Sequence, residues 1–314
     1  MKKRLIKNKL HLEIEKHKRA KKVFLILMII LAVLVAILLA FLLKPKTLGN
    51  TALIHIDGVL LTKEEPYNSG ITSSESIVAL LEDIQKNKKI KAIIFEIDSP
   101  GGGVLASQEI AQAIQDLKED IITIAVIRDV GASGAYWVAS SCDYIYANKM
   151  SITGSIGVIG SYLEYSGLLE RFNITYQRLV AGDYKDLGTP YKELTSEERN
   201  ILQKILDSIY DVFVSEVQKN RGLTKEKAEE IANGRIYLGI DAKNNGLIDD
   251  FGDIKSAIQY IEKEKGIKVS LKEYKKKSLV FPFPQISLIS YYVGKGLGDS
   301  LTEQKITQNL EIST

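Results

Sequence analysis

Residues suited to metal binding and disulfide formation are scarce in this 314-residue sequence, which contains three histidines and one cysteine. The single Cys142 excludes an intramolecular disulfide, and no cluster of cysteine and histidine has the spacing of a zinc site. His11 and His17 precede a long apolar run, and only His55 follows it. His55 alternates with two isoleucines in a strand-like segment, which favours a structural or exposed role. Histidine is the usual base of serine hydrolases, so a nucleophilic serine here needs another base.

Positive charge is also scarce outside the first 22 residues. The net charge is +3, but residues 1–22 hold ten lysines and arginines against two glutamates, which leaves −5 on the rest of the chain. A basic surface for nucleic-acid binding is therefore not expected. Basic residues directly before an apolar run are instead typical of membrane proteins, in which they remain on the cytoplasmic side.

The apolar run, residues 23–43, contains no polar side chain. At about 1.5 Å per residue its 21 residues extend over roughly 31 Å, which matches a bilayer core of about 30 Å. A cleaved signal peptide is the alternative, but its apolar region is usually about 7–15 residues long and precedes a small-residue cleavage site. Lys44-Pro45-Lys46 follows here instead. We expect an uncleaved transmembrane helix with a cytoplasmic N-terminus, a linker at 44–50 and the rest of the chain outside.

Strand-like and helix-like segments alternate after the linker. Strands are predicted at 51–58, 90–98, 121–129, 144–147 and 175–180. Helices are predicted at 72–85, with Thr72 and Glu75 as a capping box, at 104–117, from the turn at 131–135 to about 141, and at 195–221. This alternation predicts an α/β fold with a largely parallel sheet, in which sites gather in turns that leave the carboxyl ends of strands. The glycine-rich turns at 99–103 and 131–135 lie at such positions.

The second turn belongs to the stretch VGASGAYWVASSC, residues 130–142, in which Ser133 lies among four small residues. Small neighbours let a substrate or another backbone approach closely, which suits a nucleophile. The pattern is not the Gly-x-Ser-x-Gly elbow of α/β-hydrolases, because Ala135 stands two positions after the serine. Capping of the following helix is the alternative role for Ser133.

The first turn is Ser99-Pro100-Gly101-Gly102-Gly103. Its glycines can direct backbone N–H groups toward an anion or an oxyanion at a helix N-terminus, and a plain tight turn is the alternative. No Gly-Lys-Ser/Thr follows, so a nucleotide site is not expected.

A lysine can replace histidine as a base if it is neutral. The pKa of a lysine, about 10.4, must then fall by about 3 units, which costs about 4 kcal/mol and is favoured by burial. Lys185 in the stretch AGDYKDLGTPY is a candidate, because glycines and a proline surround it. A solvated loop lysine that pairs with Asp183 or Asp186 is the alternative interpretation.

Six motifs occur in order along the chain: IDSPGG at 97–102, ASGAYWVA at 132–139, DYIYAN at 143–148, TGSIGVIG at 153–160, YKDLGTP at 184–190 and GRIYLGIDAKNNGLIDDFGD at 234–253. Together, and behind a predicted anchor, they resemble the signal peptide peptidase A family of membrane-bound bacterial serine peptidases. The resemblance covers about residues 51–264, the expected extracytoplasmic domain. It implies a Clp protease/crotonase-like spiral of β-β-α units.

The same resemblance assigns roles to individual residues. It implies that Ser133 is the nucleophile, that Lys185 is the general base, and that Ser155 holds the lysine by a hydrogen bond. The N–H groups of Gly102 and Gly134 would form the oxyanion hole. No metal, nucleotide or other cofactor is implied. The implied substrates are apolar peptides, namely remnant signal peptides at the cytoplasmic membrane, and the implied assembly is a homo-oligomer.

Some features leave alternatives open. Ala135 and Trp137 stand where the family commonly has glycine and tyrosine, and we expect them to affect specificity rather than activity. The tail at 265–314 pairs a basic cluster with an apolar stretch that contains two prolines, and it is compatible with subunit, core or membrane contact. A catalytically silent peptide-binding module would have changed Ser133 or Lys185, and both are present. A crotonase-like acyl-CoA enzyme is disfavoured because the predicted anchor places the domain outside the cytoplasm.

Overall fold

The computed structural model of this chain describes residues 25, 28–35, 49–63, 70–117 and 121–274. Residues 28–35 are helical and exposed. Within the described ranges, no helix combines the length and the apolar character needed to cross a membrane. The basic segment 1–22, most of the predicted span 23–43, most of the linker 44–50 and the tail beyond residue 274 lie outside the described residues.

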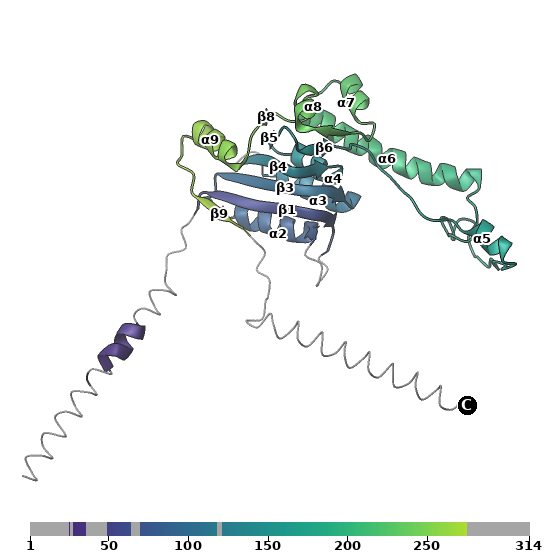
Figure 1. The fold of residues 1–314 in the computed structure, drawn as a ribbon, viewed down its shortest axis with the longest axis horizontal. Coiled ribbons are helices and arrows are strands. Elements are labelled where there is room, and N and C mark those ends of the chain that lie inside the picture. Colours follow the sequence, from purple (N-terminus) through teal and green to yellow (C-terminus); the bar gives the residue numbers. More distant parts are fainter. Residues whose placement is uncertain (1–24, 26–27, 36–48, 64–69, 118–120, 275–314) are drawn as a thin grey trace, which may run out of the picture.

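Strands of the described chain form one sheet, whose main path is β2-β1-β3-β4-β5-β8 (Figure 1). The strands are β1 (Thr51–Leu61), β2 (Ile71–Ser73), β3 (Ala92–Gly102), β4 (Ile122–Ala132), β5 (Tyr144–Ala147), β6 (Ile152–Gly154), β7 (Ile236–Leu238), β8 (Asp250–Phe251) and β9 (Leu271–Glu273). β9 pairs with β1, and β6 pairs with β4 and β7. All of these pairings are parallel except the one between β6 and β7. The predicted α/β fold with a largely parallel sheet is confirmed.

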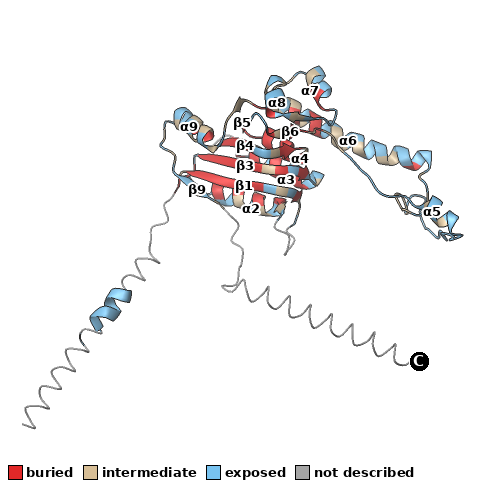
Figure 2. Ribbon diagram, viewed as in Figure 1, coloured by how far each residue is buried: buried red, intermediate tan, exposed pale blue. Residues whose placement is uncertain are grey.

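Helices pack on both faces of the sheet. The helices of the described chain after residue 49 are α2 (Ser74–Gln85), α3 (Val104–Gln115), α4 (Gly134–Ser140), α5 (Ser166–Arg171), α6 (Ser196–Arg221), α7 (Lys225–Ile231), α8 (Gly239–Asn244) and α9 (Ile254–Lys265). The larger apolar core joins the sheet to α2, α3 and α4, and the smaller core joins the opposite face to α9. Figure 2 shows that the buried residues concentrate in β1, β3, β4 and the helices against them. This burial of alternate strand residues on two faces explains the near-continuous apolar character of the central strands.

The predicted start of the first helix is wrong by one residue. The N-cap of α2 is Ser73, whose side chain accepts a hydrogen bond from the N–H of Ser76. Thr72, the predicted cap, is part of β2 instead. Its hydroxyl donates to the Asp57 carbonyl at 2.7 Å and accepts from the Asp57 N–H at 3.0 Å. The hydroxyl is therefore occupied by β1 and does not cap the helix.

The strand predicted at 175–180 is absent. This segment is irregular and exposed, and Leu179 is 96% exposed. A strand needs a neighbouring edge for its backbone hydrogen bonds. Residues 175–180 have no such edge because they lie far from the sheet, in an extension that we call the arm (residues 160–210).

The long helix α6 connects the arm to the sheet domain (Figure 1). Its 26 residues correspond to about 39 Å, and its capping box at Thr195 and Glu198 confirms the helix start predicted near 195. Only the C-terminal part of α6 is anchored in the core. There Phe213 stacks on Trp137 of α4, with ring centroids 4.5 Å apart and planes 9° apart. The Nε1–H of Trp137 donates to Glu216 Oε2 at 2.6 Å, so α4 and α6 are joined by an aromatic and a polar contact.

Replacement of Glu216 by alanine is expected to lower the free energy of unfolding by about 1–2 kcal/mol, because the buried indole N–H of Trp137 loses its charged acceptor. Trp137 is the single tryptophan of the chain, so urea unfolding followed by tryptophan fluorescence reports this contact directly. Glu216→Gln, which keeps an oxygen acceptor, serves as the matched control and should lose less. Equal stability of the alanine variant and the wild-type protein would show that water replaces the carboxylate.

Candidate active site

Ser133 lies in the sharp turn between β4 and α4, with φ 55° and ψ −126°. Residues other than glycine rarely adopt this positive φ. Two backbone hydrogen bonds hold the turn: the Ser133 N–H donates to the Gly154 carbonyl at 2.8 Å, and the Ser133 carbonyl accepts from the Trp137 N–H at 3.0 Å. Ser133 occupies the N-cap position of α4, but its side chain makes no capping hydrogen bond. The structure therefore does not support capping as the role of this hydroxyl.

The two predicted glycine-rich turns meet beside Ser133. Gly101 has φ 93°, and a Cβ there would lie 2.6 Å from the Gly134 nitrogen and 3.0 Å from the Ser133 Cβ. A Cβ on Gly134 would lie 2.1 Å from Ser107 Oγ and 3.4 Å from the Gly102 nitrogen. The backbone nitrogens of Gly102 and Gly134 are thus close neighbours, and larger residues would force the two turns apart. Paired backbone N–H groups in such a position can stabilise a developing oxyanion.

Ser155, which directly follows β6, lines the same cavity as Ser133. It has φ 51°, and its N–H donates to the Arg235 carbonyl at 2.7 Å. The cavity has a volume of about 490 Å³, and its lining residues are Ser133, Ser155, Gly157, Val158, Ile159, Tyr210, Ala232, Asn233 and Gly234. Four of the five predicted site residues therefore lie together. The wall formed by Tyr210 and residues 232–234 was not predicted, although the motif that begins at Gly234 points to this region.

No lysine, histidine or carboxylate side chain of the described chain lines this cavity. Tyr210 is the titratable group in its wall. The Tyr210 hydroxyl donates to the Ala232 carbonyl at 2.8 Å, and burial raises the pKa of Tyr210, so this phenol stays protonated. His55 is not at the cavity, and both of its ring nitrogens contact carboxylates: Nδ1 lies 2.8 Å from Glu96 Oε2, and Nε2 lies 2.9 Å from Glu273 Oε1. Among the residues that the structure describes, none at this cavity is suited to act as the base.

Lys185, the predicted base, lies in the arm and not in the cavity. Lys185 is exposed and lies in a turn, in which its backbone N–H donates to the Gly182 carbonyl at 3.1 Å. The neighbouring Tyr184 hydroxyl bonds to Glu197 in the first turn of α6. From Glu197 to Phe213, where α6 meets the core, the helix rises about 24 Å. The structure therefore brings Ser133, Ser155, Gly102 and Gly134 together. It leaves the turn that carries Lys185 in the arm, beside the first turn of α6 (Figure 1 shows the arm).

Comparison with known proteins places this chain in a family. The family model described as Peptidase family S49 matches residues 115–268, and the Clp protease model matches residues 61–151. A relative from Methanocaldococcus jannaschii that carries a protease name is 35% identical over 237 residues, which cover 75% of this chain and 76% of the relative.

Two further relatives are matched over a smaller share of their own length. One, from Enterococcus faecium, carries the name signal peptide peptidase and is 37% identical over 206 residues, or 65% of this chain and 58% of the relative. The other is the chloroplastic serine protease SPPA of Arabidopsis thaliana, 32% identical over 277 residues, or 82% of this chain and 41% of the relative. The chain belongs to peptidase family S49, the signal peptide peptidase A family, and is a serine peptidase.

Proposed function

We propose that this chain is a membrane-anchored endopeptidase in which Ser133 is the nucleophile and Lys185 the general base. The observation that carries this proposal is the turn at Ser133, which holds an uncapped hydroxyl at a cavity beside the nitrogens of Gly102 and Gly134. The apolar run at 23–43 and the basic residues before it support a single cytoplasmic-to-outside span. The motifs support a Clp-like spiral of β-β-α units at 51–264, followed by a tail for subunit or membrane contact.

The base is proposed to come from a second copy of the chain. Lys185 lies beyond the reach of Ser133 in the same chain, because about 24 Å of α6 separates the arm tip from the core. The cavity of the described chain, in turn, offers a serine without a base. When the arm tip of one copy inserts at the cavity of the next copy, the lysine of the first and the serine of the second form one complete active site. Such docking removes the lysine amine from water, which favours its neutral form.

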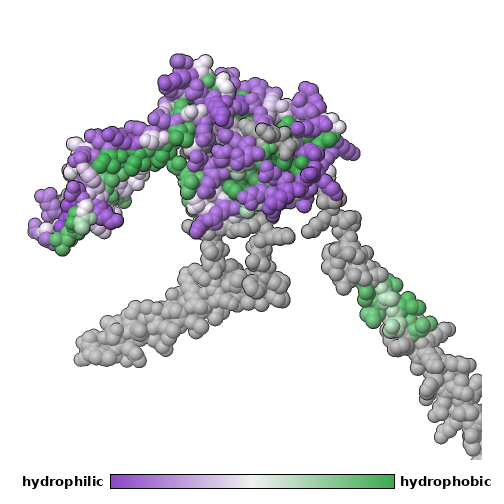
Figure 3. Space-filling model, turned by 180° about the vertical axis from the view of Figure 1, so that it is seen from behind, coloured by the Kyte–Doolittle hydropathy of each residue, from purple (hydrophilic) through white to green (hydrophobic). Residues whose placement is uncertain are grey.

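The surface of the arm supports an assembly of several copies. Figure 3 shows apolar residues gathered along one side of the arm. Large apolar side chains exposed in this part of the chain are Leu163, Leu168, Phe172, Ile174, Leu179 and Ile205. Extended apolar surface of this kind marks a protein–protein contact in a soluble domain. An arm that leaves one copy and enters the next is a head-to-tail contact, and such contacts form a ring when the rotation between successive copies closes.

The proposed reaction is an acyl transfer in two steps. Neutral Lys185 accepts the hydroxyl proton as Ser133 Oγ attacks the peptide carbonyl carbon, while Ser155 accepts or donates a hydrogen bond to orient the amine. The N–H groups of Gly102 and Gly134 donate to the oxyanion, and loss of one such donor typically costs about 3–4 kcal/mol. The lysine ammonium then protonates the leaving amine as the C–N bond breaks. Water, deprotonated by the lysine, hydrolyses the remaining serine ester.

Remnant signal peptides are the proposed substrates. They are short, apolar and left in or near the cytoplasmic membrane after their release from secreted preproteins. The proposed anchor holds the active site at that surface, on the extracytoplasmic side. Val158 and Ile159 give the cavity an apolar wall beside the two serines, which suits small or apolar substrate side chains.

Complementation between two inactive variants tests this proposal. The full-length Ser133→Ala and Lys185→Ala variants, each in detergent, are expected to hydrolyse an apolar fluorogenic peptide at background rates. Co-expression of the two with different tags should restore about one quarter of the wild-type rate, because about one contact in four of a random ring joins an intact serine to an intact lysine.

Each alternative predicts a different result. A dyad contained within one chain predicts no complementation. Near-wild-type activity of Lys185→Ala alone would show that another group is the base. A folded wild-type protein that binds the peptide without cleaving it would support the silent peptide-binding module instead.

A further inference from the structure

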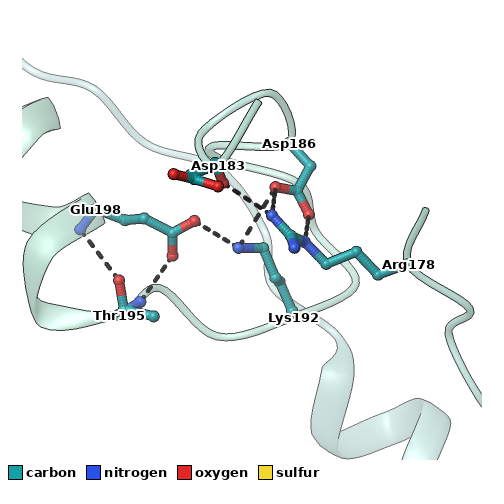
Figure 4. A network of polar contacts seen from close by, with 6 residues as sticks. All are labelled: Arg178, Asp183, Asp186, Lys192, Thr195 and Glu198. Carbon is teal, nitrogen blue, oxygen red and sulfur yellow. Dashed lines mark hydrogen bonds and ion pairs between the residues drawn. The ribbon is translucent and has the colours of Figure 1, made fainter. Parts of the chain in front are cut away.

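Charged side chains form a network around the turn that carries Lys185 (Figure 4). Arg178 contacts Asp186 through two parallel hydrogen bonds, Nε to Oδ2 at 2.7 Å and Nη2 to Oδ1 at 2.9 Å. The same Nη2 donates to the Asp183 carbonyl at 2.8 Å. One guanidinium thus joins the two residues that flank Tyr184 and Lys185. A bidentate contact of this kind fixes orientation as well as distance.

The network continues into the first turn of α6. Lys192 Nζ lies 3.7 Å from Asp186 Oδ1 and also bonds to Glu198 Oε1. Glu198 Oε2 accepts from the Thr195 N–H at 2.9 Å, which is one half of the capping box. The side chains of Asp186 and Glu198 are 10% and 4% exposed, although both lie in the thin arm. The turn at 182–186 is therefore tied to the end of the rigid helix.

The charges of this network are balanced without Lys185. Arg178 and Lys192 face the carboxylates of Asp186 and Glu198. The hydrogen bonds of Arg178 lower the pKa of Asp186 to about 2. Because the pKa is lowered, the ion pair is complete above the ordinary aspartate pKa of about 4 and is lost only as the pH falls toward 2. At neutral pH the carboxylate of Asp186, the residue after Lys185, is ionised and paired with Arg178 and Lys192.

Lys185 itself makes no side-chain hydrogen bond or ion pair with the described residues. A carboxylate close to a lysine stabilises the ammonium form, which cannot act as a base. The charged or titratable groups near this turn include Arg178, Asp183, Tyr184, Asp186, Lys192, Glu197, Glu198 and Tyr176, the last of which acts on Arg178. Among them, Asp186 is the adjacent carboxylate that Arg178 occupies.

We propose that Arg178 is a positioning residue for Lys185: it fixes the turn at 182–186 and occupies the Asp186 carboxylate, so that the lysine amine is presented without a partner among the described residues of its own chain. This inference rests on the proposed role of Lys185 as the base. It has a geometric part, the rigid turn, and an electrostatic part, the committed carboxylate. The two parts are tested separately.

Hydrogen exchange of the full-length protein tests the rigid turn without any reference to catalysis. The turn is held by the N–H groups of Lys185, Leu187 and Thr189, which donate to the carbonyls of Gly182, Tyr184 and Asp186 at 3.0–3.1 Å. Arg178→Gln is expected to raise deuterium uptake of a peptide spanning 182–190 by about tenfold in rate, while peptides from β3 and β4 are unchanged. Unchanged uptake at 182–190 overturns the proposal.

The pH dependence of kcat/KM tests the committed carboxylate. Arg178→Gln frees Asp186 to pair with Lys185, so the pH midpoint of the rise in activity should move up by about one unit, with about tenfold lower kcat/KM below it. The double variant Arg178→Gln/Asp186→Asn has no carboxylate to pair and should return the midpoint toward the wild-type value. Arg178→Lys keeps the positive charge but cannot form the two parallel hydrogen bonds to Asp186, so it should shift the midpoint less than Arg178→Gln does.

The outcomes separate this inference from the proposed function. The contrary result is an Arg178→Gln variant that loses activity equally at every pH, with no shift of the midpoint and no recovery in the double variant. That result would mean that Arg178 is only structural, and it would overturn the electrostatic part of the proposal. Full activity of Lys185→Ala overturns the proposed base, while hydrogen exchange still decides whether Arg178 fixes the turn. Fluorescence of Trp137, about 24 Å away along α6, verifies that the core is intact in every variant.

Discussion

Replacement of Ser133 by glycine is expected to abolish peptide hydrolysis and to stabilise the protein at the same time. Loss of a nucleophilic serine typically lowers kcat by about 10⁴- to 10⁶-fold. The turn, however, has φ 55° and ψ −126°, a conformation that favours glycine. A non-glycine residue held there costs about 1–3 kcal/mol, and glycine loses about 0.5–1 kcal/mol more backbone entropy on folding. The expected net gain in unfolding free energy is about 1 kcal/mol.

Ser133→Ala is the matched control for this experiment. Alanine also lacks the Oγ and should lose the same activity, but its Cβ keeps the strain, so its stability should remain near that of the wild-type protein. Turnover of a fluorogenic apolar peptide and the urea midpoint measured by tryptophan fluorescence give the two quantities. A glycine variant less stable than the alanine variant would show that the turn is not strained.

Replacement of Gly102 by alanine is expected to lower activity and stability together. A Cβ at this position would lie 2.2 Å from the carbonyl oxygen and 2.6 Å from the nitrogen of Leu60. Both are backbone atoms of β1, which cannot rotate away, so the end of β3 must shift. The shift moves the Gly102 N–H away from the oxyanion, which should lower kcat by about 10²- to 10³-fold. Forced repacking of this kind typically costs about 1–3 kcal/mol.

The adjacent Gly103 provides a control one residue away. Its φ is −61°, and a Cβ there would lie 3.5 Å from the Leu60 carbonyl oxygen and 3.9 Å from the Ala106 Cβ, which are ordinary contacts. Gly103→Ala should therefore cost less than about 1 kcal/mol, as for a helix N-cap change from glycine to alanine. Equal effects of the two substitutions would contradict the view that crowding against β1 makes Gly102 special.

Local patterns in the sequence predict the sheet domain well, because its strands and helices bury regular stripes of side chains. The long helix at 195–221 is an example: an apolar stripe and a Thr-x-x-Glu start suffice to define it. Thr72 shows the limit of such patterns. Ser73 and Thr72 are equally good caps by type, and only the hydrogen bonds between the Thr72 hydroxyl and the backbone of Asp57 in β1 decide between them.

The separation of Lys185 from Ser133 is a different kind of limit. The motifs give the order of the site residues along the chain, and four of the five do meet in space. Nothing in the spacing between 133 and 185 states that the intervening chain leaves the domain, because the exposed apolar residues of the arm look like a core pattern. Their exposure is visible only in three dimensions. For the same reason the prediction of a strand at 175–180 is wrong.

The length of α6 has a consequence for regulation under the proposed assignment. A helix that holds the Lys185 turn away from its own core, with about 24 Å between Glu197 and Phe213, makes each single chain inactive by itself. Its activator is another copy of itself, so the specific activity of dilute chains should rise with their concentration and reach a plateau once rings are complete. Confinement to two dimensions by an anchor would raise that local concentration. Proteolysis would then begin only where enough copies have gathered, and a lone chain would be harmless to its neighbours.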